Sequence, residues 1–197
     1  MTAAGEPLRV GAVVLTGGTA RRMGGADKAA LQVDGVSLLE RSLAATVSAR
    51  EVVVVGAEVA TSRPVTWTAE EPPSGGPAAA VLAGLDALRL DPELVVVLAV
   101  DMPRVTAATV ARLVWAAEAD PTVDGAVLLD REGRRQPLAA SYRRTALVAA
   151  RPARPGLEHG LPMRRLVGAL RLADVPAVGD EGMDVDTWAD LRAFGGS

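Results

Sequence analysis

The sequence predicts an α/β protein built on a doubly wound, mostly parallel sheet, with a small antiparallel addition in the second half. Three short valine-rich runs carry this prediction, namely Val10–Leu15, Val52–Val55 and Leu94–Val100. Nearly continuous apolar runs of this length are typical of strands buried on both faces of a parallel sheet. Segments with helical periodicity separate them, which indicates strand–helix–strand units whose ligands bind at the carboxyl ends of the strands.

The first helix is expected between the first two of these strands. Ser37 and Glu40 have the spacing of a capping box, in which each side chain accepts a hydrogen bond from a backbone N–H at the helix start. Leu39, Leu43 and Val47 then recur every four residues. This spacing places them on one helix face, which we expect to pack against the sheet.

Two more helices are expected on either side of the third strand. Pro77 follows Gly76 at a position where proline often begins a helix, and an apolar stripe from Val81 to Leu88 continues it. The segment Thr106–Ala119 has a helical pattern after the strand.

The second half of the chain is less regular. Gly125–Leu129 and Pro137–Tyr142 have the pattern of two strands joined by a polar turn, which predicts a hairpin or an added antiparallel edge. Such an addition could form a second subsite. The remaining elements are expected to be a loop over Arg151–Gly160, a helix over Met163–Ala169, a short strand near Leu172 and a final helix from Thr187.

Composition narrows the class of protein. With 197 residues, 49% of them hydrophobic, the chain has the size of one domain with a sizeable core. The net charge is −3 and the basic residues are scattered, so we expect no nucleic-acid partner. The absence of cysteine excludes disulfides, thiolate zinc sites and a cysteine nucleophile. The first residues lack signal-peptide character and no apolar run approaches the ~18 residues of a membrane span, which predicts a cytoplasmic protein without membrane contact.

A glycine-rich, basic segment follows the first strand directly, from Leu15 to Lys28. Its four glycines let the backbone N–H groups approach an anion, while Arg21, Arg22 and Lys28 can neutralise phosphate charge. The segment lacks both G-x-x-x-x-G-K-[ST] and G-x-G-x-x-G, which disfavours a P-loop ATPase and a dinucleotide dehydrogenase. The alternative is a tight strand-to-helix turn with a solvated arginine pair.

A single carboxylate, Asp101, follows the third strand within the sequence Asp101-Met102-Pro103. In phosphoryl chemistry Mg²⁺ is commonly held by one or two carboxylates together with substrate phosphates and water, so an acid at this strand end could begin a metal site. The alternative is a helix-capping or turn aspartate.

The segment from Leu15 to Lys28 resembles the signature L-[AT]-G-G-x-x-x-R-M-G-x-x-D-K of the molybdenum cofactor guanylyltransferases, which are MobA-like NTP transferases. This resemblance implies a Rossmann-like nucleotidyltransferase fold, Mg²⁺ as cofactor, and GTP and a molybdopterin-type acceptor as partners, with contact to molybdoenzyme maturation proteins. It implies a single domain, with a nucleotide-binding half at about 8–105 and an acceptor-binding half at about 106–197.

The same resemblance assigns roles within the loop. Leu15, Thr16 and Gly17 would hold the nucleotide through their backbone, Arg22 and the loop amides, including Gly18, would bind the triphosphate, and Lys28 would contact the phosphates at the reacting centre. Arg22, Lys28 and Asp101 would thus be catalytic. Thr16 departs mildly from the commoner alanine.

Two further elements resemble the nucleotide site of the family. Glu71 begins a segment similar to the family's acidic residue and G-P-L-A-G element, to which Gly76 belongs, and it replaces a usual aspartate. A carboxylate near the base could accept hydrogen bonds from guanine N1–H and N2–H₂, although a solvated turn acid is the alternative. Asp101 stands in a D-x-P element where the family places its Mg²⁺ aspartate.

The acceptor side resembles the family with substitutions. Gln136 replaces the histidine of H-P-L-x-x-x-Y, and the pair Arg164 and Arg165 resembles a basic element that could bind a phosphate or could be a solvated helix face. Asp184 and Asp186 replace two asparagines of N-[IV]-N-T-x-x-[DE]-L. They could add metal ligands, for which Asp186 is our candidate, or bind pterin donors, and Asp186 could instead cap the last helix.

The reaction implied by the resemblance is transfer of GMP from GTP to the molybdenum–molybdopterin cofactor, with release of pyrophosphate. A phosphate nucleophile is already ionised, so no strong base is required and catalysis rests on positioning and charge neutralisation. Alternatives are a cytidylyltransferase acting on the same pterin, another NTP transferase acting on a sugar, polyol or phospholactate, and a non-catalytic nucleotide-binding relative. The only histidine, His159, lies in a Pro/Arg-rich segment and is expected to be a loop residue.

Overall fold

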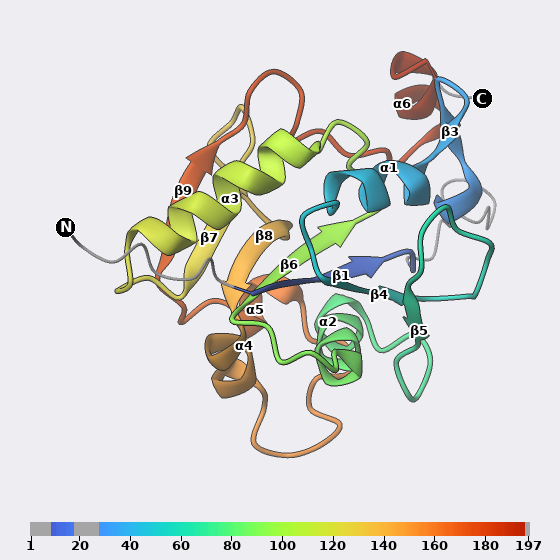
Figure 1. Cartoon of the computed structure of the whole chain (residues 1–197). Coiled ribbons are helices and arrows are strands. Elements are labelled where there is room, and N and C mark those ends of the chain that lie inside the picture. The colour runs from blue at the N-terminus through green and yellow to red at the C-terminus, as the bar shows by residue number, and fades with distance from the viewer. Residues whose placement is uncertain (1–8, 18–27, 196–197) are drawn as a thin grey trace.

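The structure is a computed structural model that describes residues 9–17 and 28–195. A seven-stranded sheet with the order β5-β4-β1-β6-β8-β7-β9 forms its centre, and helices cover both faces (Figure 1). The strands of this sheet are β1 (Val10–Leu15), β4 (Glu51–Val55), β5 (Thr66–Thr68), β6 (Leu94–Ala99), β7 (Gly125–Leu129), β8 (Arg135–Arg143) and β9 (Leu172–Pro176). The helices are η2 (Lys28–Ala30), α1 (Leu38–Ala45), α2 (Pro77–Ala87), α3 (Ala107–Ala119), α4 (Arg144–Ala150), α5 (Met163–Leu166) and α6 (Trp188–Ala193).

The sheet is mostly parallel, as predicted. β1 pairs in parallel with β4 and β6, β4 with β5, and β7 with β9, whereas β8 is antiparallel to both of its neighbours, β6 and β7. The predicted antiparallel addition is therefore β8, inserted between parallel strands and not added at an edge. The amino end of β8 lies at the carboxyl ends of β6 and β7, because Leu98 pairs with Ala139 and Leu129 with Arg135.

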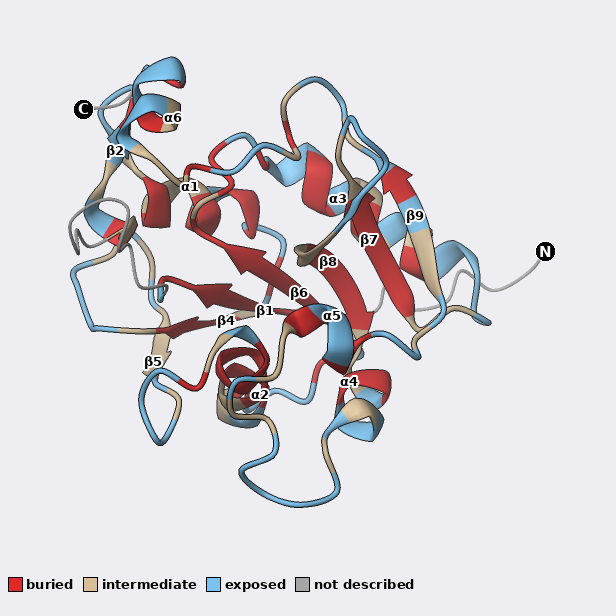
Figure 2. Ribbon diagram, turned by 180° about the vertical axis from the view of Figure 1, so that it is seen from behind, coloured by how far each residue is buried: buried red, intermediate tan, exposed pale blue. Residues whose placement is uncertain are grey.

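The central strands β1, β4 and β6 are buried along nearly their whole length (Figure 2), and their alternate residues enter two hydrophobic cores. Ala12 and Val14 of β1 pack in one core with residues of α1 and α3, while Val13 and Leu15 pack in the other with residues of α2, α4 and α5. Helices thus cover both faces, which confirms the doubly wound architecture (Figure 1).

The helix starts follow local chemistry, although one helix is shorter than its pattern suggests. The Ser37 hydroxyl accepts from the Glu40 N–H at 3.2 Å, but the Glu40 carboxylate accepts from the Ser62 N–H and does not complete the capping box. Because α1 ends at Ala45, Val47 lies outside it with 66% of its surface exposed, so its predicted place in the packed stripe is wrong. The helix predicted over Thr106–Ala119 is confirmed as α3, with Thr106 as its N-cap.

Several short elements were not predicted. A separate hairpin joins β2 (Gln32–Val33) to β3 (Val36–Ser37) through Asp34 and Gly35, which have φ values of 52° and 75°. This Asp-Gly pair suits a two-residue turn that needs positive φ at both positions. β5 and α4 were also missed, and the predicted helix from Met163 ends at Leu166. None of the helices in the described ranges has the length and hydrophobicity that crossing a bilayer requires.

Candidate active site

The carboxyl ends of two neighbouring parallel strands bring the predicted site residues together. Leu15, the last residue of β1, pairs with Ala99, the last residue of β6. The Val100 N–H then donates to the Leu15 carbonyl at 3.0 Å, which holds the two chain segments side by side beyond the strands. Asp101 follows at this edge, where parallel sheets commonly bind ligands.

Thr16 and Gly17 leave β1 with different environments. The Thr16 hydroxyl donates to the Val55 carbonyl at 3.0 Å and the residue is buried, so this side chain ties β1 to β4. Its oxygen would lie 1.9 Å from a Cβ at Gly56, so only glycine fits there. A Cβ added at Gly17 would meet no atom of the described residues within 4 Å. Gly18 and Arg22, predicted to bind the triphosphate, lie outside the described residues, as does Arg21.

Lys28 joins three distant parts of the chain at one point. Its ammonium Nζ lies 3.3 Å from Asp101 Oδ2, 3.1 Å from Asp186 Oδ1 and 3.0 Å from the Val185 carbonyl oxygen. Only 10% of the Lys28 side chain is exposed, compared with 27% for Asp101 and 47% for Asp186. The three predicted residues therefore form one cluster.

Burial and charge act against each other in this cluster. Burial lowers the pKa of the Lys28 ammonium, but Asp101 and Asp186 together hold that pKa above its ordinary value. Burial raises the pKa of the Asp101 carboxyl, and Lys28 opposes this change. Two carboxylates thus converge on a single position that favours a cation. Within the described ranges, no group of three or more histidine or acidic side chains forms a metal-binding cluster by itself.

Two cavities meet at Asp101. The first, which we call the glycine-side cavity, has a volume of about 500 Å³, and the second, the arginine-side cavity, about 380 Å³. The residues that line both cavities are Pro77, Ala99, Asp101 and Leu138. A ligand in each cavity would therefore contact the same carboxylate from two sides.

The glycine-side cavity has an apolar wall and two acids, Asp101 and a second one. Leu15 and Val55 line it from the ends of β1 and β4, and Gly76, with φ of 85°, lines it at the start of α2. This second acid is Glu70, which is partly buried and makes no hydrogen bond or ion pair with other described residues. Glu71, the predicted base-contacting acid, is exposed and is not among the residues that line this cavity.

The arginine-side cavity is lined by Arg135 and Arg164 together with Gln136 and Asp184. Arg165, the second member of the predicted basic pair, does not line it. The Gln136 amide nitrogen donates to Asp130 Oδ2 at 2.9 Å, which orients the side chain because a carboxylate can only accept. Sequence reasoning missed this partner.

The loop of residues 177–187, between β9 and α6, carries the two aspartates that replace asparagines. Asp184 lines the arginine-side cavity, and Asp186 contacts Lys28. The N-cap of α6 is Thr187, whose hydroxyl accepts from the Asp190 N–H at 3.1 Å, so the alternative role of Asp186 as the cap is not what the structure has.

Other features of the site carried no recognisable sequence signal. Glu70 and Glu71 are adjacent acids, and only the path of the chain after β5 decides which one enters the cavity wall. His159 lies in a loop as expected, packed against Gly75, where an added Cβ would lie 2.9 Å from its Cε1 atom. The Gly160 N–H donates to the Gly75 carbonyl at 2.8 Å, so this loop supports the turn that begins α2.

Solved structures share this fold over nearly the whole chain. The molybdopterin-guanine dinucleotide biosynthesis protein A of Archaeoglobus fulgidus is 19% identical, with a TM-score of 0.67 over 94% of this chain and 96% of that one. A Methanothermobacter nucleotidyl transferase is 21% identical, with a TM-score of 0.71 over 95% and 96%. The 2-C-methyl-D-erythritol 4-phosphate cytidylyltransferase of Thermus thermophilus is 25% identical, with a TM-score of 0.65 over 92% and 95%.

Comparison at the sequence level gives the family. No curated protein sequence matches this chain significantly. Residues 12–174, however, match the family described as the MobA-like NTP transferase domain, and this span includes Lys28, Asp101 and both acids at positions 70 and 71. The chain therefore belongs to the MobA-like NTP transferases.

Proposed function

We propose that the protein transfers GMP from GTP to the terminal phosphate of a molybdenum–molybdopterin cofactor and releases pyrophosphate. The observation that carries this proposal is that Asp101, which lines both cavities, contacts the Lys28 ammonium, which in turn contacts Asp186. A transferase that joins two phosphates needs two adjoining subsites and positive charge where they meet.

In the proposed transfer, the main task of this chain is to position the two phosphates that react. An oxygen of the acceptor phosphate attacks the α-phosphorus of GTP, and the bond from that phosphorus to the bridging oxygen of the β-phosphate breaks. Pyrophosphate leaves with the electron pair, so no oxidant or reductant is involved. Because the attacking phosphate is already ionised, the absence of a histidine or cysteine base near Asp101 is no obstacle. Lys28 supplies fixed positive charge beside the carboxylate that lines both cavities.

The donor set fits a divalent cation that is completed by substrate. Asp101 and Asp186 both contact the Lys28 ammonium, and their carboxylates are the hard oxygen ligands that Mg²⁺ prefers, so a cation could bind beside Lys28. Bound there, Mg²⁺ would neutralise charge on the triphosphate. The remaining ligands would come from phosphate oxygens and water, consistent with a site of fewer than three protein acids.

In this proposal, Glu70 is the residue that selects guanine. Its carboxylate lines the glycine-side cavity without a partner among the described residues, so it can accept hydrogen bonds from adjacent donors. Guanine offers the adjacent pair N1–H and N2–H₂, whereas the corresponding edge of cytosine offers one amino group beside acceptors. In the other cavity the Arg164 side chain would meet the anionic acceptor, and Arg135, which is ion-paired with Asp174, would add positive charge to the lining.

Neighbouring acids provide a matched test of the base contact. Glu70→Gln should raise KM for GTP by about tenfold, since hydrogen bonds to charged groups contribute about 1.5–3 kcal/mol. Glu71→Gln, which changes an exposed acid, should leave KM for GTP unchanged. If Glu71→Gln raised KM for GTP more than Glu70→Gln does, Glu71 would be the acid that contacts the base. If both variants had the same KM for GTP as the wild type, neither acid would contact the base.

A cytidylyltransferase is the second candidate, because the Thermus thermophilus cytidylyltransferase shares the fold at 25% identity. Incubation with each NTP in turn, Mg²⁺ and the molybdenum–molybdopterin cofactor, with measurement of pyrophosphate and of the dinucleotide product, separates the candidates. If GTP is the only NTP that yields pyrophosphate, the proposal is supported. If CTP is the only one, the protein is a cytidylyltransferase and the proposal is wrong. GTP binding without pyrophosphate release would indicate a non-catalytic relative or a different acceptor.

A further inference from the structure

One acidic side chain outside the cluster is buried together with its charge. Glu181 lies in the loop of residues 177–187 and is 8% exposed. Among the described residues, it is the only acidic or basic residue that is buried as a whole. Removing a carboxylate from water is unfavourable unless its oxygens are fully hydrogen bonded. The burial of Glu181 must therefore be compensated by its neighbours.

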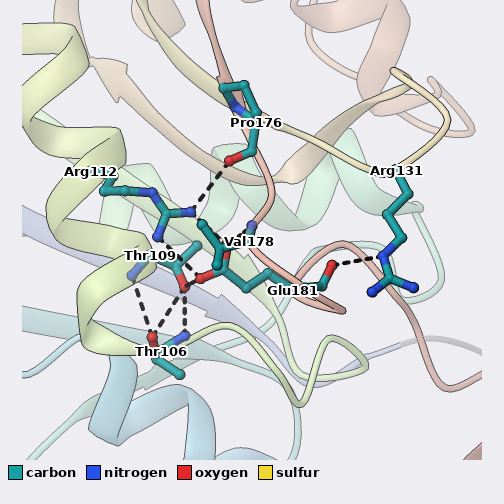
Figure 3. A network of polar contacts seen from close by, with 8 residues as sticks. Thr106, Thr109, Arg112, Arg131, Pro176, Val178 and Glu181 are labelled. Atoms are coloured by element: carbon teal, nitrogen blue, oxygen red, sulfur yellow. Dashed lines mark hydrogen bonds and ion pairs between the residues drawn. The ribbon is translucent and has the colours of Figure 1, made fainter.

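Both oxygens of Glu181 are used by rigid neighbours (Figure 3). Oε1 accepts from the Thr109 hydroxyl at 2.6 Å and from Arg112 Nη1 at 3.2 Å, while Oε2 accepts from Arg112 Nη2 at 2.5 Å and from the Val178 N–H at 2.8 Å. Thr109 and Arg112 belong to α3, and the Thr109 hydroxyl also accepts from the Thr106 N–H at the start of that helix. These contacts hold the pKa of Glu181 below its ordinary value, although burial acts in the opposite direction.

The same loop is attached to the site a few residues later. The Val185 N–H donates to the Asp101 backbone carbonyl at 2.7 Å, and the Val185 carbonyl accepts from Lys28. Gly182 lies against Asp130, because a Cβ at Gly182 would be 2.8 Å from the Asp130 Cα. Asp184 and Asp186 are therefore carried on a short span that is fixed to α3 at Glu181 and to the end of β6 at Val185.

We propose that Glu181 is a positioning residue that holds the loop against α3 so that Asp184 and Asp186 stay beside Asp101 and Lys28. This inference rests on the function proposed above, because it gives these two aspartates a part in binding the acceptor and the cation. Glu181 itself does not line either of the two cavities that meet at Asp101. Its influence passes through the backbone of residues 182–186.

Two conservative variants test this role. Glu181→Gln keeps the shape but places an amide NH₂ against the donors of Arg112 or Val178, and Thr109→Val keeps the shape of the helix residue but removes one donor. The control is Asp86→Asn, which breaks another two-bond pair with an arginine, Arg151, on an exposed surface. Exposed pairs of this kind contribute little to stability.

The steady-state constants separate positioning from general destabilisation. Glu181→Gln should raise both KM for the acceptor and the half-saturating Mg²⁺ concentration by about tenfold, the lower end of the effect of changing groups that orient metal ligands. KM for GTP should stay unchanged, because the glycine-side cavity is built from β1, β4 and α2. Thr109→Val should change the same two constants in the same direction, by less. A lower melting temperature with all constants unchanged would reduce Glu181 to a structural residue and overturn the proposal.

Amide hydrogen exchange provides a measurement that needs no turnover. In Glu181→Gln the amides of residues 182–187, including the Val185 N–H, should exchange faster than in the wild type, with those of β1 and β6 unchanged. Equal exchange of this loop in both proteins would contradict the proposal. If the wild-type protein itself transfers no nucleotide, the proposed function fails, and exchange together with Mn²⁺ binding still decides whether Glu181 orders the loop.

Discussion

The two halves of the sheet bring the residues of the candidate site to the same edge by different means. In β5, β4, β1 and β6 all strands are parallel, so their carboxyl ends deliver residues such as Leu15 and Asp101 directly to that edge. β8 runs the other way, so it is the amino end of this strand, beginning at Arg135, that arrives there. The reversed strand therefore brings Arg135 to the edge at which the parallel strands of the first half end, where its guanidinium pairs with Asp174 of β9.

The difference has consequences for how each cavity is built. The glycine-side cavity is formed largely by strand ends and the first turn of α2, which are fixed by the core. The arginine-side cavity combines the start of β8, the start of α5 and the loop that carries Asp184. The glycine-side cavity thus follows from sheet topology, whereas the arginine-side cavity depends on a loop and on element starts whose positions other contacts must fix.

The largest effect is expected where the halves meet. Lys28→Ala should lower kcat for GMP transfer by about 10²–10³-fold, comparable to removing one group that stabilises transition-state charge. Melting temperature and circular dichroism should show an intact fold, and Arg151→Ala, a cation remote from the cavities, serves as the control. Lys28 is the only lysine in the chain, so acetylation of the protein tests the same charge independently. Near-normal transfer by Lys28→Ala would contradict the assignment.

The next effect concerns the carboxylate that both cavities share. Asp101→Asn keeps the shape of the side chain but removes its charge, so it should raise the Mg²⁺ concentration needed for pyrophosphate release or abolish that release. The measurement is the rate of pyrophosphate release as a function of Mg²⁺, with Asp86→Asn as the control. An unchanged dependence on Mg²⁺ would place the metal site elsewhere.

A smaller effect should separate the two cavities from each other. Glu70 lines only the glycine-side cavity and Arg164 only the arginine-side cavity. Glu70→Gln should therefore raise KM for GTP and leave KM for the acceptor unchanged, while Arg164→Ala should do the reverse, each by about tenfold. Arg165→Ala is the matched control, since Arg165 lines neither cavity. Variants that change both KM values equally would show that the cavities do not act as separate subsites.

The smallest expected effect is on stability and depends on pH. The folded pKa of Glu181 lies below 4.5, so its contribution to folding is full above the unfolded pKa and is lost as the pH falls through the folded pKa. Glu181→Gln should lower the free energy of unfolding by about 1–3 kcal/mol at neutral pH. Urea denaturation at pH 7 and at about pH 4 should show the difference from wild type shrinking at the lower pH. A difference that is equal at both values would mean that the charge of Glu181 does not stabilise the fold.

Much of the fold could be predicted because its signals are local. The valine-rich runs of β1, β4 and β6 specify buried strands through composition alone, and the Gly76-Pro77 step marks the start of α2. The missed elements are those with weak local signals, such as the three residues of β5 and the short helix α4. The exposure of Val47 shows the limit of periodicity, because spacing predicts a face but not where the helix ends.

In the candidate site, too, some residues could be predicted from the sequence and others could not. The residue types of Lys28, Asp101 and Asp186 could be selected from motifs, and the structure brings these side chains into contact. The sequence could not decide which of the adjacent residues Glu70 and Glu71 lines the cavity, since the side chains of neighbouring residues can point in opposite directions. Gly18 and Arg22 remain predictions, because they lie outside the described residues.

By itself, the sequence determined that this chain forms a doubly wound α/β sheet, with a cationic glycine-rich segment after the first strand and an acid after a central strand, because strand burial is encoded by neighbouring residues. Only the tertiary structure decided that Asp186 meets Lys28, that Glu70 enters the cavity wall, and that Glu181 holds its loop against α3. These choices depend on contacts between residues up to 158 positions apart, whose geometry is set by the packing of the whole sheet.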